Sequence, residues 1–272
     1  MSRHRAVARI ASLLAVLGIL QAMAGSAAAA DAVSAEARVQ LAPTGKLRVA
    51  FLMFEPALAS RDAAGEPIGV APDLARALAE RTGLPLDPIL FDAPASYAQS
   101  VGSLKWDIAF AGRDAAGAGR VDYGPAFVLI DHELLLAPGR TFRDLADIDR
   151  DKVRVGVTIG TIDEQLLSQR LKKAFVFRVL VGTDNASVTL RNSGADLFAA
   201  SAPFLAKVAA EVPGSRLLDP PFAVVPAAVA VSPGRTAALA YIAEFVRQAK
   251  ASGFIQQSID RAHLQGVRVA PP

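Results

Sequence analysis

The chain has 272 residues, a formal net charge of +3 and no cysteine. The absence of cysteine excludes disulfides, thiol catalysis and zinc sites built on thiolates. The first 30 positions hold three of the 29 Lys and Arg residues and none of the 26 Asp and Glu residues, so the rest of the chain is formally neutral. That part contains no basic stripe with interleaved aromatic residues, and nucleic-acid binding is therefore not indicated.

Residues 1–30 are predicted to be a secretory signal peptide. Arg3, Arg5 and Arg9 give a positive start, residues 10–24 (IASLLAVLGILQAMA) are apolar, and residues 25–32 offer small side chains for cleavage near Asp31. The alternative is a membrane anchor, for which the apolar run is short. Because no cysteine is available for lipid attachment, we expect an exported, membrane-free monomer in the periplasm.

The next part of the chain predicts a first set of alternating strands and helices. Residues 31–44 lack strong periodicity and are interpreted as a flexible lead-in. Residues 46–54 (KLRVAFLMF) form a nearly continuous apolar run, typical of a strand covered on both faces. After turn residues at 61–69, the pattern predicts a helix over 71–83, a strand over 86–91, a helix over 96–104 and a strand over 107–112.

A second set of the same alternation begins at residue 152. It predicts strands over 152–157, 177–182, 195–201 and 226–232, and helices over 161–174, 186–194, 203–212 and 235–253. Two such sets favour two α/β lobes over one large sheet. We expect lobe 1 to contain 45–136 and 227–265, lobe 2 to contain 137–226, joints at 131–139 and 220–226, and a tail over 266–272.

Charged and small residues follow the predicted strand over 107–112. Its last residue, Gly112, leads into a run of Ala and Gly with Arg113 and Arg120 on either side. Open α/β proteins bind their ligands beyond the carboxyl ends of parallel strands. The sequence therefore predicts a ligand site at this edge.

Seven segments, in order, resemble the periplasmic solute-binding proteins of the amino-acid type (bacterial extracellular solute-binding protein family 3), which are partners of ABC transporters. The most specific is RDAAGEPIGVAPDLARALAERTGLPL, and the others are GKLRVAF, WDIAFAG, VDYGPAFVLIDHELLL, FRDLADIDRDKVRVGVTIGT, GADLFAAS and VRQAKASGFIQQSI. The resemblance implies an α/β, two-lobed type II fold, in which each lobe is a mostly parallel sheet flanked by helices. It also implies that hinge closure captures a small polar ligand, an amino acid or a related carboxylate, for an inner-membrane permease.

The chain departs from two contacts of this family. Family members hold the ligand carboxylate with an Arg after the third strand, but the matching positions here are Gly117 and Gly119. The family's Asp that pairs with an α-ammonium is replaced by Ser201. The resemblance therefore leaves open whether the ligand carries an α-amino group.

The residues around the missing Arg supply the candidates for charge recognition. Arg113 is expected to take a ligand carboxylate, because a guanidinium matches it bidentately, or else to be a solvated loop residue. Arg120 is the second candidate, unless it forms a surface ion pair with Asp122. Asp114 either accepts a hydrogen bond from a ligand amine or caps a helix.

Other candidates lie at predicted strand ends and helix starts. Thr161 begins the first helix of lobe 2, where free N–H groups bind anions, or else only caps that helix. Phe54 and Glu55 end the first strand, and Tyr97 faces the cleft unless it packs in the core. The complete predicted site is Phe54, Glu55, Tyr97, Gly112, Arg113, Asp114, Arg120, Thr161 and Ser201.

The sequence indicates a binding protein rather than an enzyme. We expect no cofactor and no metal site, since the three histidines (4, 132 and 263) are scattered and no motif for catalysis or phosphate binding is present. One alternative is an enzyme of the cyclohexadienyl dehydratase kind on the same fold, with Glu55 or Asp114 as the acid. The other is a sensor or assembly partner whose ligand site has degenerated.

Overall fold

A computed structural model describes residues 33–113, 119–192 and 194–272. The chain separates into two compact units, Met1–Ala35 and Glu36–Pro272. The predicted signal peptide and its cleavage position lie outside the described residues. The second unit contains the sheet and the candidate site.

The strands form one large sheet and a small hairpin. The sheet has the order β4-β1-β5-β10-β6-β9-β7-β8, and β11 also pairs with β6. Its strands are β1 (Leu47–Leu52), β4 (Leu86–Phe91), β5 (Ile108–Gly112), β6 (Asp122–Leu136), β7 (Arg154–Thr158), β8 (Phe175–Val179), β9 (Leu197–Ser201), β10 (Arg216–Val231) and β11 (Val267–Val269). The hairpin pairs β2 (Ser60–Arg61) with β3 (Pro67–Ile68) around the predicted turn.

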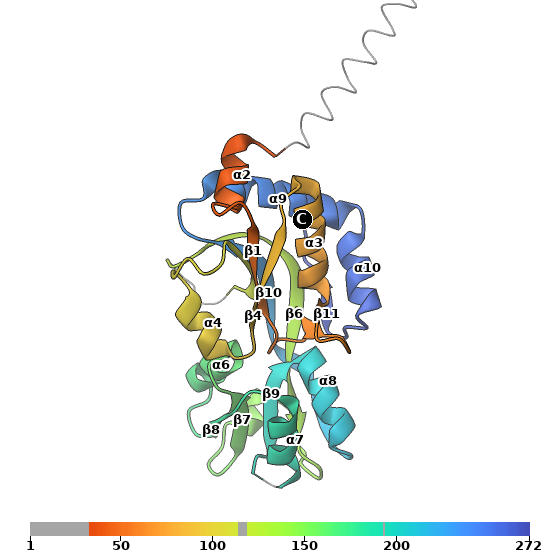
Figure 1. Cartoon of the computed structure of the whole chain (residues 1–272). Helices are drawn as coiled ribbons and strands as arrows, with labels where there is room; N and C mark the ends of the chain where they lie inside the picture. The colour runs from red at the N-terminus through yellow and green to blue at the C-terminus, as the bar shows by residue number, and fades with distance from the viewer. Residues whose placement is uncertain (1–32, 114–118, 193) are drawn as a thin grey trace, which may run out of the picture. The chain divides into compact units, whose positions relative to one another are not determined.

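The sheet has two halves that share β6 and β10. In the first half β1 pairs in parallel with β4 and β5, and in the second half β7 pairs in parallel with β8 and β9. The long strands β6 and β10 run antiparallel to each other through both halves (Figure 1). Ile130 still pairs with β11 in the first half, whereas His132 pairs with β9 in the second. The two predicted α/β sets are therefore present, but the joints are strands, so the sheet is continuous.

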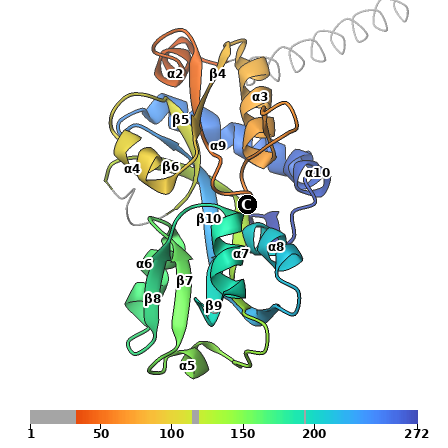
Figure 2. The same ribbon diagram turned by 60° about the horizontal axis from the view of Figure 1, so that its bottom comes forward.

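Helices pack on each half of the sheet (Figures 1 and 2). Contacts join α3, α9 and α10 to the first half and α6, α7 and α8 to the second. The helices are α2 (Ala35–Leu41), α3 (Val70–Thr82), α4 (Pro94–Ser100), α5 (Leu145–Ile148), α6 (Ile162–Arg170), α7 (Thr183–Arg191), α8 (Ala202–Glu211), α9 (Thr236–Ala251) and α10 (Phe254–Arg261). Among the described residues, none of these helices combines the length and the apolar character needed to cross a membrane.

The apolar runs of the sequence are strands covered on both faces. In β6, Leu134 and Leu136 pack into one core cluster, while the intervening Leu135 packs into another on the opposite face of the sheet. Successive side chains of a strand point to opposite faces, so a strand with helices on both sides needs apolar residues at every position. This explains why the run contains no polar alternation.

Two segments that we expected to be irregular are ordered elements. The interpretation of 31–44 as a flexible lead-in is wrong for Ala35–Leu41, which forms α2 with Leu41 fully buried. Arg235 also holds this helix by donating a hydrogen bond to the Gln40 carbonyl at 3.0 Å. The predicted tail over 266–272 contains β11, which pairs with β6. Both segments are short and carry no strong periodicity, so their order comes from tertiary contacts.

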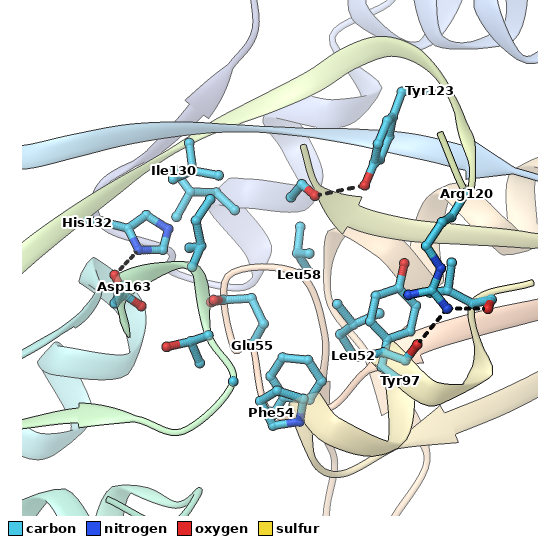
Figure 3. A pocket seen from close by; sticks show the side chains of 18 residues that line it. Leu52, Phe54, Glu55, Leu58, Tyr97, Arg120, Tyr123, Ile130, His132 and Asp163 are labelled. Atoms are coloured by element: carbon cyan, nitrogen blue, oxygen red, sulfur yellow. Dashed lines mark hydrogen bonds and ion pairs between the residues drawn. The ribbon is translucent and has the colours of Figure 1, made fainter. Parts of the chain in front are cut away.

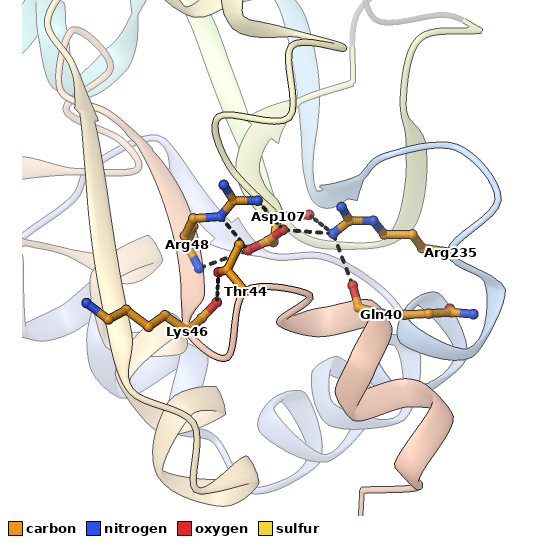
Figure 4. A network of polar contacts seen from close by, with 6 residues as sticks. All are labelled: Gln40, Thr44, Lys46, Arg48, Asp107 and Arg235. Atoms are coloured by element: carbon orange, nitrogen blue, oxygen red, sulfur yellow. Dashed lines mark hydrogen bonds and ion pairs between the residues drawn. The ribbon is translucent and has the colours of Figure 1, made fainter.

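A buried carboxylate ties α2, the sheet and α9 together (Figure 4). Asp107, whose side chain is fully buried, accepts hydrogen bonds from Arg48 Nε and Nη2, both at 2.9 Å. Arg235 Nη1 reaches the same carboxylate at 3.1 Å. These two cations compensate the buried negative charge just before β5, and they fix the strand that leads to the candidate site.

Candidate functional site

A cavity of about 120 Å³ lies where the two halves of the sheet meet. Its lining includes the carboxyl ends of β1 and β5, the turn after β7 and the part of β6 that passes between the halves (Figure 3). The cavity therefore has the position that open α/β sheets use for ligands.

Glu55 extends into this cavity from the turn after β1 (Figure 3). Its Oε1 accepts a hydrogen bond from Ser201 Oγ at 2.7 Å and another from the Ala57 backbone N–H at 3.2 Å. No described residue donates a hydrogen bond to Oε2. Ser201 ends β9, so the bond from Ser201 to Glu55 joins the second half of the sheet to the first.

A histidine–aspartate pair lies beside Glu55. Nδ1 of His132 is 2.6 Å from Oδ1 of Asp163, and the two residues are only 2% and 4% exposed. His132 comes from β6 where the strand passes between the halves, and Asp163 comes from the first turn of α6. The other ring nitrogen, Nε2, has no partner among the described residues, and Figure 3 shows it on the side of the ring away from Asp163.

The pKa values of Glu55 and His132 are both raised. Burial raises the pKa of Glu55 above its ordinary value, although the His132 charge and the bonds from Ser201 and Ala57 oppose this effect. Burial by itself would lower the pKa of His132, but the Asp163 carboxylate outweighs it and raises that pKa. Each of the two groups therefore keeps its proton to a higher pH than it would in water.

Aromatic side chains and one arginine line the other side of the cavity (Figure 3). Tyr97 is stacked on Trp106 with ring centroids 6.1 Å apart, which fixes its position at the edge of the core. Arg120 Nη2 donates to the Val101 carbonyl at 2.7 Å. The alternative ion pair with Asp122 is not formed between these described residues, because Asp122 Oδ2 instead accepts from the Gly234 backbone N–H at 2.9 Å.

The N-terminus of α6 lines the cavity, but acidic side chains of the helix itself already interact with this end. The Thr161 hydroxyl donates to the Thr158 carbonyl at 2.7 Å. The Gly160 N–H, which would otherwise face an anion, donates to the Glu164 carboxylate at 2.6 Å. Because Asp163 and Glu164 stand in the first turn, the positive helix end is already compensated.

The structure brings six of the nine predicted residues to the cavity wall, namely Phe54, Glu55, Tyr97, Gly112, Arg120 and Thr161. Arg113 is exposed and outside the lining, and its guanidinium carbon lies 5.7 Å from the centroid of the Tyr123 ring. Ser201 is buried and reaches the cavity only through Glu55. Asp114 and Gly117 lie outside the described residues.

Among the cavity residues that the sequence analysis missed, His132 and Asp163 form an ion pair. The two residues lie 31 positions apart in the sequence. A signal did exist: the polar triplet Asp131, His132 and Glu133 interrupts an otherwise apolar strand. Polar residues within a strand that is buried on both faces point to a site. No group of metal-binding side chains is found among the described residues.

The chain was compared with known proteins. No protein-family model and no curated protein matches it. Several solved structures do. A putative binding component of an ABC transporter from Wolinella succinogenes, complexed with lysine, has a TM-score of 0.71 at 22% identity, covering 80% of this chain and 95% of that one. An amino-acid ABC transporter substrate-binding protein from Streptococcus pneumoniae, bound to L-arginine, has a TM-score of 0.72 at 19% identity, covering 82% and 96%.

The chain has the type II periplasmic-binding-protein fold. The predicted fold class is thereby confirmed. The fold is also shared with the ancestral amino-acid-binding protein AncCDT-1, a precursor of cyclohexadienyl dehydratase, with a TM-score of 0.70 at 20% identity, covering 82% of this chain and 97% of that one. At these identities the likeness concerns the fold, and the function rests on the cavity.

Proposed function

We propose that the chain is the substrate-binding component of an ABC transporter, which captures a small polar solute between its two lobes and delivers it to a membrane permease. The observation that carries this proposal is the cavity, which is lined from both halves of the sheet and contains charged groups of both signs. Similar structures of this fold hold lysine or arginine, which supports an amino acid or a related small carboxylate as the solute.

We assign the recognition of a ligand carboxylate to Arg120. The sequence favoured Arg113, but only Arg120 lines the cavity. Its guanidinium is oriented by the Val101 and Ala98 carbonyls, at 2.7 and 3.3 Å, and it retains further N–H donors for an anion. Tyr97 provides an apolar wall for the ligand's carbon chain.

The way the chain passes between the two halves supports closure of the lobes. We propose that lobe 1 consists of about 45–130 and 225–272 and lobe 2 of the intervening residues, with the hinge in β6 and β10 where the pairing partners change. Few residues need to change conformation at such a hinge. The proposal includes export through the predicted signal peptide and function as a monomer in the periplasm.

We propose binding rather than catalysis, with a dehydratase-like enzyme on the same fold as the alternative. Glu55 beside the His132–Asp163 pair is the observation that favours the alternative, because an acid and a base with shifted pKa values are what proton transfer needs. The two are separated by recovering the bound solute after prolonged incubation. A transporter component returns it unchanged, whereas an enzyme returns a product.

Native mass spectrometry of the protein purified from the periplasm, followed by a thermal-shift screen, tests the proposal. The screen should contain amino acids, organic acids and amines. We expect a co-purified small solute, or a raised unfolding midpoint with a subset of these compounds. A protein that carries no solute and is stabilised by none of them would contradict the proposed function.

A further inference from the structure

The buried end of the cavity contains one more acid than base. Glu55, Asp163 and His132 are gathered there, and only His132 is able to carry a positive charge. Burying an uncompensated charge is costly, so a group in this position either takes up a proton or finds a counter-charge. Since His132 is already paired with Asp163 at 2.6 Å, Glu55 is the acid without a cation.

The hydrogen bonds of Glu55 leave one of its oxygens available to a ligand. Oε1 is held by Ser201 and by the Ala57 N–H, whereas Oε2 has no donor among the described residues. Glu55 is only partly buried, and it lines the cavity. The carboxyl group is therefore fixed by the protein at one oxygen and open to the cavity at the other.

We propose that Glu55 selects solutes that carry a protonated amine, with Ser201 as the positioning residue that fixes its carboxyl group. The inference rests on the proposed binding function and narrows its substrate class. In the complex the ligand's ammonium group supplies the counter-charge that Glu55 lacks among the described residues, at the oxygen that the protein leaves without a donor. An ammonium group supplies up to three N–H donors and the missing positive charge.

The surroundings of Glu55 favour an ammonium group over a neutral donor. The titratable groups that face it are His132 on β6 and Asp163 on α6, and their pair carries at most one charge of each sign. Ser201, at the end of β9, contributes a neutral hydroxyl. A neutral ligand adds no charge to this group, whereas a cation pairs with the ionised Glu55 and brings the group of three to neutrality.

The test compares amines with their deaminated counterparts by isothermal titration calorimetry. Suitable pairs are L-lysine with 6-aminohexanoate, L-norleucine with hexanoate, and L-glutamate with glutarate. The variants are Glu55→Gln, Ser201→Ala and, as a matched control in the exposed hairpin turn, Glu66→Gln. Some pairs will contain a compound that binds to the wild type. In each of these pairs, we expect the compound with the additional amine to bind at least about tenfold more tightly, because its ammonium group forms a charge-assisted hydrogen bond with Glu55.

The variants test whether Glu55 causes the preference for amine-bearing compounds. Glu55→Gln should remove the preference, Ser201→Ala should reduce it, and Glu66→Gln should leave it unchanged. Repeating the wild-type titration in two buffers of different ionisation enthalpy counts the protons exchanged. At a titration pH close to the raised pKa of Glu55, an ammonium ligand should displace protons from this group, and the release should be smaller in Glu55→Gln.

The possible failures are distinguishable. If compounds bind but the deaminated members bind equally well, or if Glu55→Gln keeps the preference, the inference is wrong while the proposed binding function stands. If no compound of the panel binds, and the screen for solutes also fails, both are wrong. Thermal unfolding of each variant without ligand shows whether the variant is folded.

Discussion

The close approach of Gly160 to Pro94 offers a direct test of the proposed closure of the lobes. Gly160 follows β7 with φ +79°, and a Cβ built on it would lie 3.2 Å from the Pro94 Cβ of α4 in the other half of the sheet. Ordinary carbon contacts lie at about 3.5–4.0 Å. Gly160→Ala therefore strains the backbone by about 1–2 kcal/mol in any state of the lobes. It also overpacks the arrangement of α4 and α6 seen in this structure, which we propose is the closed one, by about 1–3 kcal/mol.

A matched variant separates the two effects. Gly139 has φ +78° and nothing within 4 Å of a built Cβ, so Gly139→Ala carries the backbone strain without the contact. Both variants should lose similar stability in denaturant unfolding. Only Gly160→Ala should bind the solute found in the screen more weakly, by about five- to 150-fold in calorimetry, since the overpacking opposes closure alone. Equal affinity in the two variants would refute a binding mode in which α4 and α6 approach each other.

Three further predictions concern charged residues. Arg120→Ala should weaken binding of a carboxylate solute by at least about thirtyfold in calorimetry, whereas Arg113→Ala should change it little; the reverse order would restore Arg113 as the clamp. Asp107→Ala should lower the free energy of unfolding by about 3–5 kcal/mol in urea titrations, because it leaves two partly buried guanidinium groups without their shared carboxylate. The pKa values of Glu55 and His132 are both raised, so each contributes stability below its ordinary pKa that is lost as pH rises through its folded-state pKa. Unfolding midpoints of the ligand-free protein should therefore fall from mildly acidic to alkaline pH, and Glu55→Gln should flatten that decline.

The fold was predictable from the sequence where local patterns decide it. The strand expected over 86–91 matches β4 at both ends, and the helix expected over 71–83 ends at Gly83, which adopts the left-handed conformation of a helix cap. The predictions were less accurate where distant contacts decide. The strand expected over 226–232 extends back to Arg216, because β10 pairs with β6 beyond the predicted joint.

The site was predictable only in part, for the same reason. Strand ends identified Glu55 and Gly112, since any parallel strand presents its carboxyl end to the ligand edge. The spacing of Arg residues could not separate Arg113 from Arg120, because that depends on how the chain returns from β5 to β6. The pairing of His132 with Asp163 depends on β6 and α6 meeting at the cavity, which no local pattern encodes.

The departure from the family pattern at Ser201 has a physical consequence. Ser201 replaces an acid in the second half of the sheet, and the structure places the carboxyl group of Glu55, from the first half, against its hydroxyl at 2.7 Å. An acid attached to one half is present whether the lobes are open or closed. Here Oε1 accepts one hydrogen bond from Ala57 in its own half and one from Ser201 in the opposite half, so the second bond forms only when the two halves lie together as in this structure. If the lobes close around a cationic ligand as proposed, closure and recognition of the ligand's positive charge are coupled, since a ligand that stabilises the oriented carboxyl group also stabilises the closed state.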